Sequence, residues 1–283
     1  MKFLIIGDLH GQKPRIYFKG FDAIIAPGDF CSDAPRTYMF EALRQRLQDP
    51  LSTVKWWDLT EKKKAREMIK QSFADGRKIL EFLDSLGVPV YTVPGNWDWT
   101  GIDADTAIVK KNLYHDLIKG LDHVVDIYHR RVDIGAYEII GHGITSGPEY
   151  PQYPEDRKRL SSQALQQMKR TYQQTSKKLV SLFEKATKPV IFLSHNVPFN
   201  TPLDVITNTE SPRCGCHYGS LIAREMIDAY QPLVCIGGHM HEHFTSCTIG
   251  KTVAINAGFG SEVNVWMELE GNRIKNLEFH RGL

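Results

Sequence analysis

The sequence has few cysteines and no long hydrophobic run. Its cysteines are odd in number and scattered along the 283 residues: Cys31, Cys214, Cys216, Cys235 and Cys247. This is not the pattern of a disulfide framework, and free thiols favour the reducing cytoplasm. No apolar run approaches the roughly 20 residues that a membrane helix needs, and the apolar start stops at Gly7-Asp8, too early for a signal-peptide core. We therefore predict a cytoplasmic protein with no membrane partner.

The sequence also lacks an excess of charge of either sign. Its 35 Lys and Arg residues nearly balance its 33 Asp and Glu residues, which gives a formal net charge of +2. This balance argues against a dedicated nucleic-acid or membrane-surface binder. The apolar fraction of 42% is ordinary for a globular protein, and no linker-like stretch divides the chain. We expect residues 1–283 to form a single domain.

Strand and helix patterns alternate along the chain. Short apolar runs predict strands at residues 2–6, 22–26, 88–93, 189–193 and 232–236. Longer mixed patterns predict helices at residues 33–47, 61–86 and 220–230, and a long helix or a helix pair at residues 156–186. Residues 124–140 suggest two further strands, and residues 243–279 are rich in strand patterns. The alternation favours an α/β sheet with helices on its faces, and the tail indicates a second, more antiparallel sheet.

Polar side chains follow five of the apolar runs at the point where each predicted strand ends. They are Asp8, His10, Asp29, Asn96, His195, His239 and His241. Ligands in open α/β sheets gather at the carboxyl ends of strands, so we expect these side chains to converge. Imidazole and carboxylate donors without sulfur suit Mn, Fe, Zn, Ni or Co. Seven donors are too many for one ion with an open position, but they fit two ions that share a bridging carboxylate.

Each of these pieces also has an ordinary interpretation. An Asp after a strand is often a helix N-cap, and a Gly-Asn pair is usually a turn. A single buried His is commonly a hydrogen-bonded core residue. The ordered set, with every member at a strand end, favours the metal site. The glycines beside the ligands are expected to let the backbone bend sharply there.

The ordered motifs resemble the calcineurin-like metallophosphoesterase superfamily. They are Asp8-Leu9-His10, Gly28-Asp29, Gly95-Asn96, His195 and Gly238-His239-Met240-His241. The resemblance implies a four-layer αββα sandwich of two mixed β-sheets flanked by helices. It also implies that Asp8, His10 and His241 hold one metal, that Asn96, His195 and His239 hold the other, and that Asp29 bridges them. The segment from His217-Tyr218-Gly219-Ser220 to His241 further resembles small prokaryotic phosphoesterases.

The resemblance implies a metal-dependent phosphoric ester hydrolase. Two divalent ions about 3.5–4 Å apart lower the pKa of a bridging water, and the resulting hydroxide attacks phosphorus in line with the leaving group. Manganese is our first choice of metal, ahead of Fe, Zn, Ni, Co and Mg. The expected partner is a phosphorylated small molecule or a nucleotide. The sequence names neither the substrate nor the oligomeric state, and it leaves a homo-oligomer open.

The sequence departs from the family pattern after Asn96. Many members have His there, followed by an acidic residue, whereas this chain has Trp97 and Asp98. Indole donates a hydrogen bond but cannot give up its proton as an acid. We therefore expect aryl phosphodiesters or phosphoanhydrides to be better substrates than simple alkyl monoesters. Asp98 remains a candidate catalytic residue.

The long loop at residues 196–217 joins two ligand-bearing strands and is expected to overhang the metals. Its Arg213 and His217 are candidates for binding phosphate or supplying a proton, and an ordinary surface loop is the alternative. Cys214-Gly215-Cys216 could be a metal clip or a redox pair, although free thiols are commoner. His142 ends a predicted strand and could approach the site or pack in the core.

Two other functions compete with the phosphoesterase. The scaffold subunit of the retromer coat resembles this superfamily and also lacks the His, but a scaffold does not need all seven ligands. A nuclease of the same superfamily is the other alternative. Trp56-Trp57, Trp97 and Trp99 could form an aromatic wall for a base, although core packing explains most of them. The near-neutral charge counts against nucleic acid as a partner.

Overall fold

The computed structural model describes residues 1–49, 51–102, 106–209, 211 and 213–282, which form two six-stranded sheets. The first sheet has the order β12-β11-β1-β2-β3-β4 and the second β5-β6-β7-β8-β10-β9. The strands of the first are β1 (Lys2–Ile5), β2 (Ala23–Ala26), β3 (Val90–Thr92), β4 (Val124–Asp126), β11 (Val263–Glu270) and β12 (Arg273–Arg281). Those of the second are β5 (Arg131–Asp133), β6 (Glu138–His142), β7 (Val190–Asn196), β8 (Val234–Gly238), β9 (Ser246–Ile249) and β10 (Thr252–Asn256).

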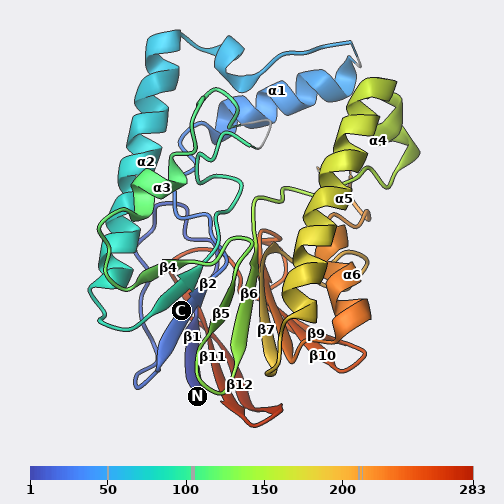
Figure 1. Cartoon of the computed structure of the whole chain (residues 1–283). Coiled ribbons are helices and arrows are strands. Elements are labelled where there is room, and N and C mark those ends of the chain that lie inside the picture. The colour runs from blue at the N-terminus through green and yellow to red at the C-terminus, as the bar shows by residue number, and fades with distance from the viewer. Residues whose placement is uncertain (50, 103–105, 210, 212, 283) are drawn as a thin grey trace.

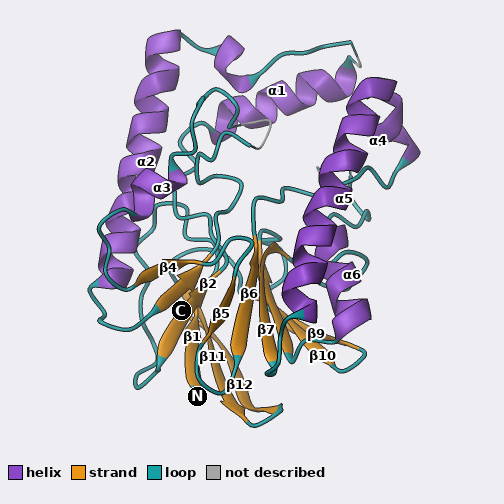
Figure 2. Cartoon of the chain, viewed as in Figure 1, coloured by secondary structure: helices purple, strands orange, loops and turns teal. Residues whose placement is uncertain are grey.

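Both sheets are mixed. In the first, β1 to β4 are parallel, and β11 pairs with β1 in the antiparallel sense. In the second, β6, β7, β8 and β10 are parallel, while β5 and β9 are antiparallel strands at the edges. The parallel strands of each sheet therefore end at one edge of that sheet. In Figure 2 the loops that follow them meet above the strands.

Helices cover the outer face of each sheet. They are α1 (Arg36–Gln48), the 3₁₀ helix η1 (Trp56–Leu59), α2 (Lys62–Asp84), α3 (Tyr114–Ile118), α4 (Pro154–Lys158), α5 (Ser162–Glu184) and α6 (Leu221–Tyr230). In Figure 1, α2 and α3 flank the first sheet, α5 and α6 flank the second, and α1 crosses above the strand ends. The Ser161 and Ser220 hydroxyls cap α5 and α6 by accepting backbone N–H groups at 3.1 and 3.0 Å.

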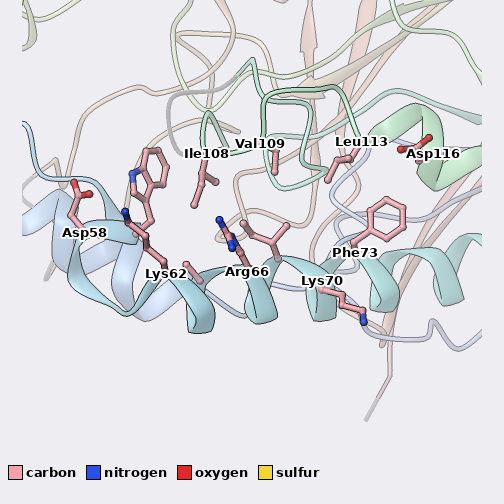
Figure 3. Close-up of a pocket in the computed structure, with 12 residues that line it drawn as sticks. Asp58, Lys62, Arg66, Lys70, Phe73, Ile108, Val109, Leu113 and Asp116 are labelled. Carbon is pink, nitrogen blue, oxygen red and sulfur yellow. The ribbon is translucent and has the colours of Figure 1, made fainter.

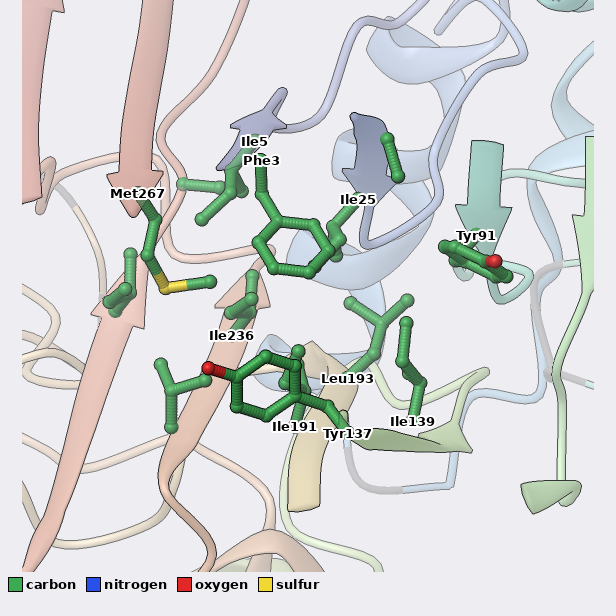
Figure 4. Close-up of a cluster of buried hydrophobic side chains, with 14 of the residues drawn as sticks. Phe3, Ile5, Ile25, Tyr91, Tyr137, Ile139, Ile191, Leu193, Ile236 and Met267 are labelled. Atoms are coloured by element: carbon green, nitrogen blue, oxygen red, sulfur yellow. The ribbon is translucent and has the colours of Figure 1, made fainter. Parts of the chain in front are cut away.

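Three apolar cores separate these layers, because alternate residues of a strand face opposite sides of its sheet. Phe3 points between the two sheets, where it joins Ile191 and Ile236 of the second sheet (Figure 4). The next residue, Leu4, belongs to the core beneath α2 with Leu80. A third core lies between the second sheet and helices α5 and α6. These layers confirm the αββα sandwich that the resemblance implied.

Two expectations about the strands were wrong. The strand-rich tail does not build a sheet of its own, because β9 and β10 extend the second sheet while β11 and β12 return to the first. Residues 124–140 form three strands rather than two, and they divide between the sheets, with β4 in the first and β5 and β6 in the second. The sequence analysis also missed the short helices η1 and α3.

The cysteines form no disulfide, since all five are free thiols. This confirms the free-thiol interpretation of Cys214 and Cys216. Within the described residues, no helix is both long and apolar enough to cross a membrane. The expectation of a single domain over residues 1–283 stays a prediction.

Candidate metal centre

The seven side chains singled out in the sequence come together where the strands end. Two groups have ligand atoms within 4.8 Å of one another, namely Asp8 with His10 and His241, and Asp29 with His195 and His239. Within the first group, His241 Nε2 lies 3.4 Å from Asp8 Oδ2. Each group takes residues from both sheets. His195 lies in β7, and His239 and His241 follow β8, all in the second sheet. Asp8 and His10 follow β1 and Asp29 follows β2, both in the first sheet.

Asp29 lies between the two groups. Its Oδ2 is 3.5 Å from His10 Nε2 on one side and 3.5 Å from His195 Nε2 on the other. Asn96 joins the second group, since its Oδ1 lies 2.8 Å from His195 Nε2. Asp29 is therefore in the position that a bridging carboxylate would take.

His195 is oriented by the backbone of the β2 turn. Its Nδ1 lies 2.8 Å from the carbonyl oxygen of Pro27, which can only accept, so Nδ1 carries the proton. The lone pair is then on Nε2, which faces Asp29 and Asn96. A hydrogen bond to the second nitrogen commonly fixes the tautomer of a metal-ligating His.

Several buried polar atoms of the site would be satisfied by cations. Asp8 Oδ1 and both ring nitrogens of His10 have no hydrogen-bond partner among the described residues, although Asp8 is 0% and His10 only 5% exposed. Buried polar atoms in proteins are nearly always hydrogen-bonded. Four imidazoles, two carboxylates and one amide form a donor set that suits several divalent transition metals. The residues present therefore fit a pair of divalent ions.

The electrostatics keep the donors in the form that binds metal. Burial lowers the pKa of His10 to about 3 and the pKa of His239 to about 3, so both rings are neutral near pH 7. Burial works against ionisation of Asp8, but the hydrogen bond from His241 and the charge of the nearby imidazoles outweigh it and lower the pKa of that carboxyl. The site thus combines an ionised Asp8 carboxylate with neutral rings at His10 and His239.

Three of the candidate ligands have a left-handed backbone. His10, Asp29 and His239 have φ values of 45°, 57° and 65°. Residues other than glycine seldom adopt this conformation, which costs roughly 1–2 kcal/mol each. Such strain concentrates at functional sites.

The glycines beside the ligands are needed for space as well as for bending. A Cβ atom on Gly95 would lie 2.1 Å from Asp29 Oδ1, and one on Gly238 would lie 2.5 Å from Asp8 Oδ1. Neither of these glycines has a positive φ, whereas Gly28 has a φ of +102°. The expectation of a bend therefore holds at Gly28, while Gly95 and Gly238 let the carboxylates lie against the backbone.

The Asp98 carboxylate binds backbone N–H groups and does not line the cavity over the metal groups. Its carboxylate accepts the N–H groups of Asp29, Phe30, Cys31 and Gly95 at 2.8–3.1 Å. The side chain is buried, and these bonds join the turn after β2 to the turn after β3. Its proposed catalytic role stays a prediction, and its contacts support a positioning role instead.

Arg213 and His217 are engaged with other groups of the long loop and its surroundings. Arg213 Nη2 donates to Asp156 Oδ1 at 2.7 Å, and His217 Nδ1 lies 2.7 Å from Asp204 Oδ1. Arg213 lines a cavity of about 740 Å³ next to the candidate metal site. Neither residue is among the described residues that line the cavity over the metal groups. Their roles in handling substrate stay predictions.

A cavity of about 260 Å³ opens over the metal groups and reveals residues that sequence reasoning missed. Five candidate ligands line it: His10, Asp29, Asn96, His239 and His241. Helix α1 supplies the opposite wall with Arg36, Met39, Phe40 and Leu43. Arg36 pairs with Asp33 at 3.0 Å, and no other Arg or Lys among the described residues lines this cavity. The one feature of the sequence that could have indicated this wall is that the helix α1 begins seven residues after Asp29.

Two of the tryptophans singled out in the sequence lie in the core, and a third lines the cavity over the metal groups. Trp56 and Trp99 are 0% exposed, and their rings lie 6.2 Å apart. Trp97 alone lines the cavity, with its ring 5.7 Å from that of His10. This arrangement contradicts an aromatic wall made of several tryptophans.

His142 has a structural environment. Its Nε2 lies 3.0 Å from Glu149 Oε1, and its ring stacks on His129 at 5.7 Å. Glu149 also accepts the N–H of Leu221 at the start of α6. This supports the core interpretation of His142.

The comparisons with known proteins agree with this geometry. The family model described as calcineurin-like phosphoesterase matches residues 1–243. One crystal structure covers 100% of this chain and 99% of its own, with a TM-score of 0.63 and 15% identity. The crystal structure of TT1561 from Thermus thermophilus covers 99% of this chain and 98% of its own, with a TM-score of 0.55 and 15% identity. Identities this low show similarity of fold alone. No curated protein matches the sequence.

Proposed function

Because the chain belongs to the calcineurin-like phosphoesterase family, we propose that it hydrolyses phosphate esters with the help of two divalent metal ions. The observation that carries the proposal is the position of Asp29 Oδ2, which lies 3.5 Å from an imidazole nitrogen of each metal group. Asp8, His10 and His241 would hold one ion, and Asn96, His195 and His239 the other. Two such ions would supply Lewis-acid charge and a water acidic enough to act as the nucleophile.

The residues around the ions would position the ester. Arg36 offers a planar fork of N–H donors that suits phosphoryl oxygens, and it lines the same cavity as Asp29 and Asn96. Its ion pair with Asp33 is made through Nη1, which leaves the rest of the fork available. We infer that Arg36 binds the phosphoryl group of the substrate.

The wall formed by α1 favours an apolar group on the substrate. Met39, Phe40 and Leu43 face the metal groups across the cavity, and Phe40 is 48% exposed. Burying an aryl or nucleobase surface against them would add to binding. This supports a phosphodiester or an activated aryl ester as the substrate class. We also propose that the reaction takes place in the cytoplasm.

The completeness of the metal groups supports an enzyme rather than a scaffold. A scaffold has no need for buried ligand atoms such as Asp8 Oδ1 and the His10 nitrogens to be left without a hydrogen-bond partner among the described residues. The separation of the tryptophans removes the feature that had suggested a nuclease. We therefore favour a phosphoesterase over a scaffold protein and over a nuclease.

Reloading the metal-stripped protein tests the proposed function. The stripped chain should be inactive on bis(p-nitrophenyl) phosphate and should recover activity on titration with a divalent metal, with saturation near two ions per chain. Mn²⁺, Fe²⁺, Zn²⁺, Ni²⁺, Co²⁺ and Mg²⁺ are compared, and we expect Mn²⁺ to give the highest turnover. Stripped protein that stays fully active, or protein that binds two ions without hydrolysing bis(p-nitrophenyl) phosphate, would contradict the proposal.

Replacing Trp97 with His is expected to help substrates with poor leaving groups. A general acid contributes about 10²–10⁴-fold to bond cleavage, and Trp97 cannot act as one. Its backbone N–H donates to Asp29 Oδ1 at 2.7 Å, a bond that the substitution leaves in place. We therefore expect Trp97→His to raise kcat for alkyl esters at least about tenfold while changing kcat for aryl esters much less.

The measurement is a series of esters graded by leaving-group pKa, run on both proteins. Trp97→Phe is the matched control, because it removes the indole without adding an acid and should leave the slope of rate against leaving-group pKa as steep as in the wild type. A wild-type slope that is already flat would mean that another residue supplies the proton, with His217 the first to examine.

A further inference from the structure

A second cavity, separate from the metal site, lies against the N-terminal half of α2. It has a volume of about 730 Å³, within the range of small-molecule sites. It shares no lining residue with the cavity over the metal groups. We propose that it binds a free long-chain carboxylate, with the alkyl chain among apolar side chains and the carboxylate against Arg66.

The floor of the cavity is an apolar ridge of α2. Ala65, Ile69 and Phe73 line it, and their spacing of four residues places them on one face of the helix. Figure 1 shows this half of α2 rising past the strands, and Ile69 and Phe73 are only partly buried. The ridge faces a loop, and a gap remains between the helix and that loop.

The opposite wall comes from a segment between β3 and β4. Ile108, Val109 and Leu113 face α2 across the gap in Figure 3. All three are only partly buried. An alkyl chain laid in this gap would remove apolar surface from water on both sides.

A cationic ridge runs beside the apolar one. Lys62, Arg66 and Lys70 line the cavity and also repeat every four residues along α2. All three are exposed, and no hydrogen bond or ion pair joins any of their side chains to another described residue. In Figure 3 the Arg66 side chain points from α2 toward Ile108. Within the described part of the chain, Arg66 is thus a free guanidinium at the mouth of an apolar cavity.

The acidic residues at this cavity are already occupied. Asp116 pairs with Lys111 at 2.6 Å, and Asp58 Oδ2 accepts the N–H of Lys55 at 2.9 Å. Lys62, Arg66 and Lys70 outnumber these two carboxylates, so the side chains that line the cavity have an excess of positive charge. Charge complementarity therefore requires an anionic ligand, and the apolar lining requires that the anion carry a hydrocarbon chain.

The shape of the site favours a free ligand over a membrane surface. Binding to a bilayer needs apolar side chains that protrude into it, but the strongly exposed large apolar residues among those described are Phe40, Leu51 and Ile102. None of these lines the cavity. Its apolar side chains are recessed between α2 and the loop, so the ligand must enter the protein.

The test is calorimetric titration of the whole chain with dodecanoate below its micelle concentration. Saturable binding is expected with about one molecule per chain, and each methylene removed should weaken affinity about fourfold, so that decanoate binds roughly an order of magnitude more weakly. Arg66→Gln should raise the Kd for dodecanoate about ten- to a hundredfold, because a hydrogen-bonded charge pair is lost. Decyl maltoside, which has no charge, should bind equally weakly to both proteins.

Lys63→Gln is the matched control. Lys63 is exposed on the same turn of α2 but does not line the cavity, so the Kd of this variant should equal that of the wild type. Ile108→Asn tests the apolar wall from the loop side and should weaken the binding of every chain length. Equal binding of dodecanoate to wild type and Arg66→Gln would overturn the proposal. So would a protein that ignores free dodecanoate but sediments with phosphatidylglycerol vesicles.

Discussion

Replacing Asp29 with alanine is expected to empty both metal positions and to reduce turnover at least about 10³-fold. The carboxylate is the group within 3.5 Å of imidazole nitrogens from both metal groups, so its loss weakens both at once. A pair of catalytic ions lowers the barrier by several kcal/mol, and each 1.36 kcal/mol corresponds to about a factor of ten in rate. Elemental analysis of the purified protein and kcat on an aryl phosphodiester give the two readouts.

The comparison with His195→Ala makes this prediction specific. His195 Nε2, the nitrogen with the lone pair, faces Asp29 and Asn96 of the second group, so this variant should retain about one ion per chain while Asp29→Ala retains almost none. Asp33→Asn is the control, because Asp33 lines the same cavity but belongs to neither group, and its metal content should match the wild type. Two ions retained in Asp29→Ala would show that this carboxylate is not the bridge.

Replacing Asp98 with alanine is expected to lower the free energy of unfolding by about 4 kcal/mol. The carboxylate accepts four buried backbone N–H groups, and a buried donor left without an acceptor costs about 1–3 kcal/mol. Part of this cost is recovered if water enters the space. Urea unfolding of the metal-stripped protein measures the effect without a contribution from bound ions.

Asp98→Asn should lose about half as much, because its amide oxygen still accepts while its NH₂ group faces backbone donors. Asp228→Ala is the control, since Asp228 is exposed and its one ion pair with a described residue is with Arg224 on α6, and it should change stability by less than about 0.5 kcal/mol. An unchanged urea midpoint in Asp98→Ala would mean that the two turns are held by something else. A large loss of kcat with unchanged stability would instead support the catalytic role suggested by the sequence.

The positions of the candidate ligands could be predicted from the sequence because each is marked by a short motif of adjacent residues. An apolar run followed by Gly-Asp, Gly-Asn or Gly-His predicts both the strand and the side chain at its end. Parallel strands then bring those ends to one edge of the sheet. The left-handed backbone at His10, Asp29 and His239 could not be read in this way. It arises from contacts between turns, such as the bond from the His10 N–H to the Asp29 carbonyl, that join residues far apart in sequence.

Long-range pairing explains the rest of what was missed. The tail was expected to form its own sheet, yet β11 pairs with β1, so that Val265 lies opposite Ile5. No local pattern encodes which of two sheets an apolar strand joins. The same holds for Arg36, whose position over the metal groups depends on how α1 folds back across the strand ends, and for Arg213, whose partner Asp156 is 57 residues away.

The division of the ligands between the sheets has a mechanical consequence. Asp8 and His10 follow a strand of the first sheet and His241 a strand of the second, while Asp29 belongs with the first and His195 with the second. Each bound ion would therefore act as a crosslink at one end of a seam whose interior is held together by apolar contacts. Those contacts resist separation along the length of the seam but offer little resistance to peeling from its edge. The candidate metal centre lies at that edge, so the same coordination bonds would also keep the two sheets from separating there.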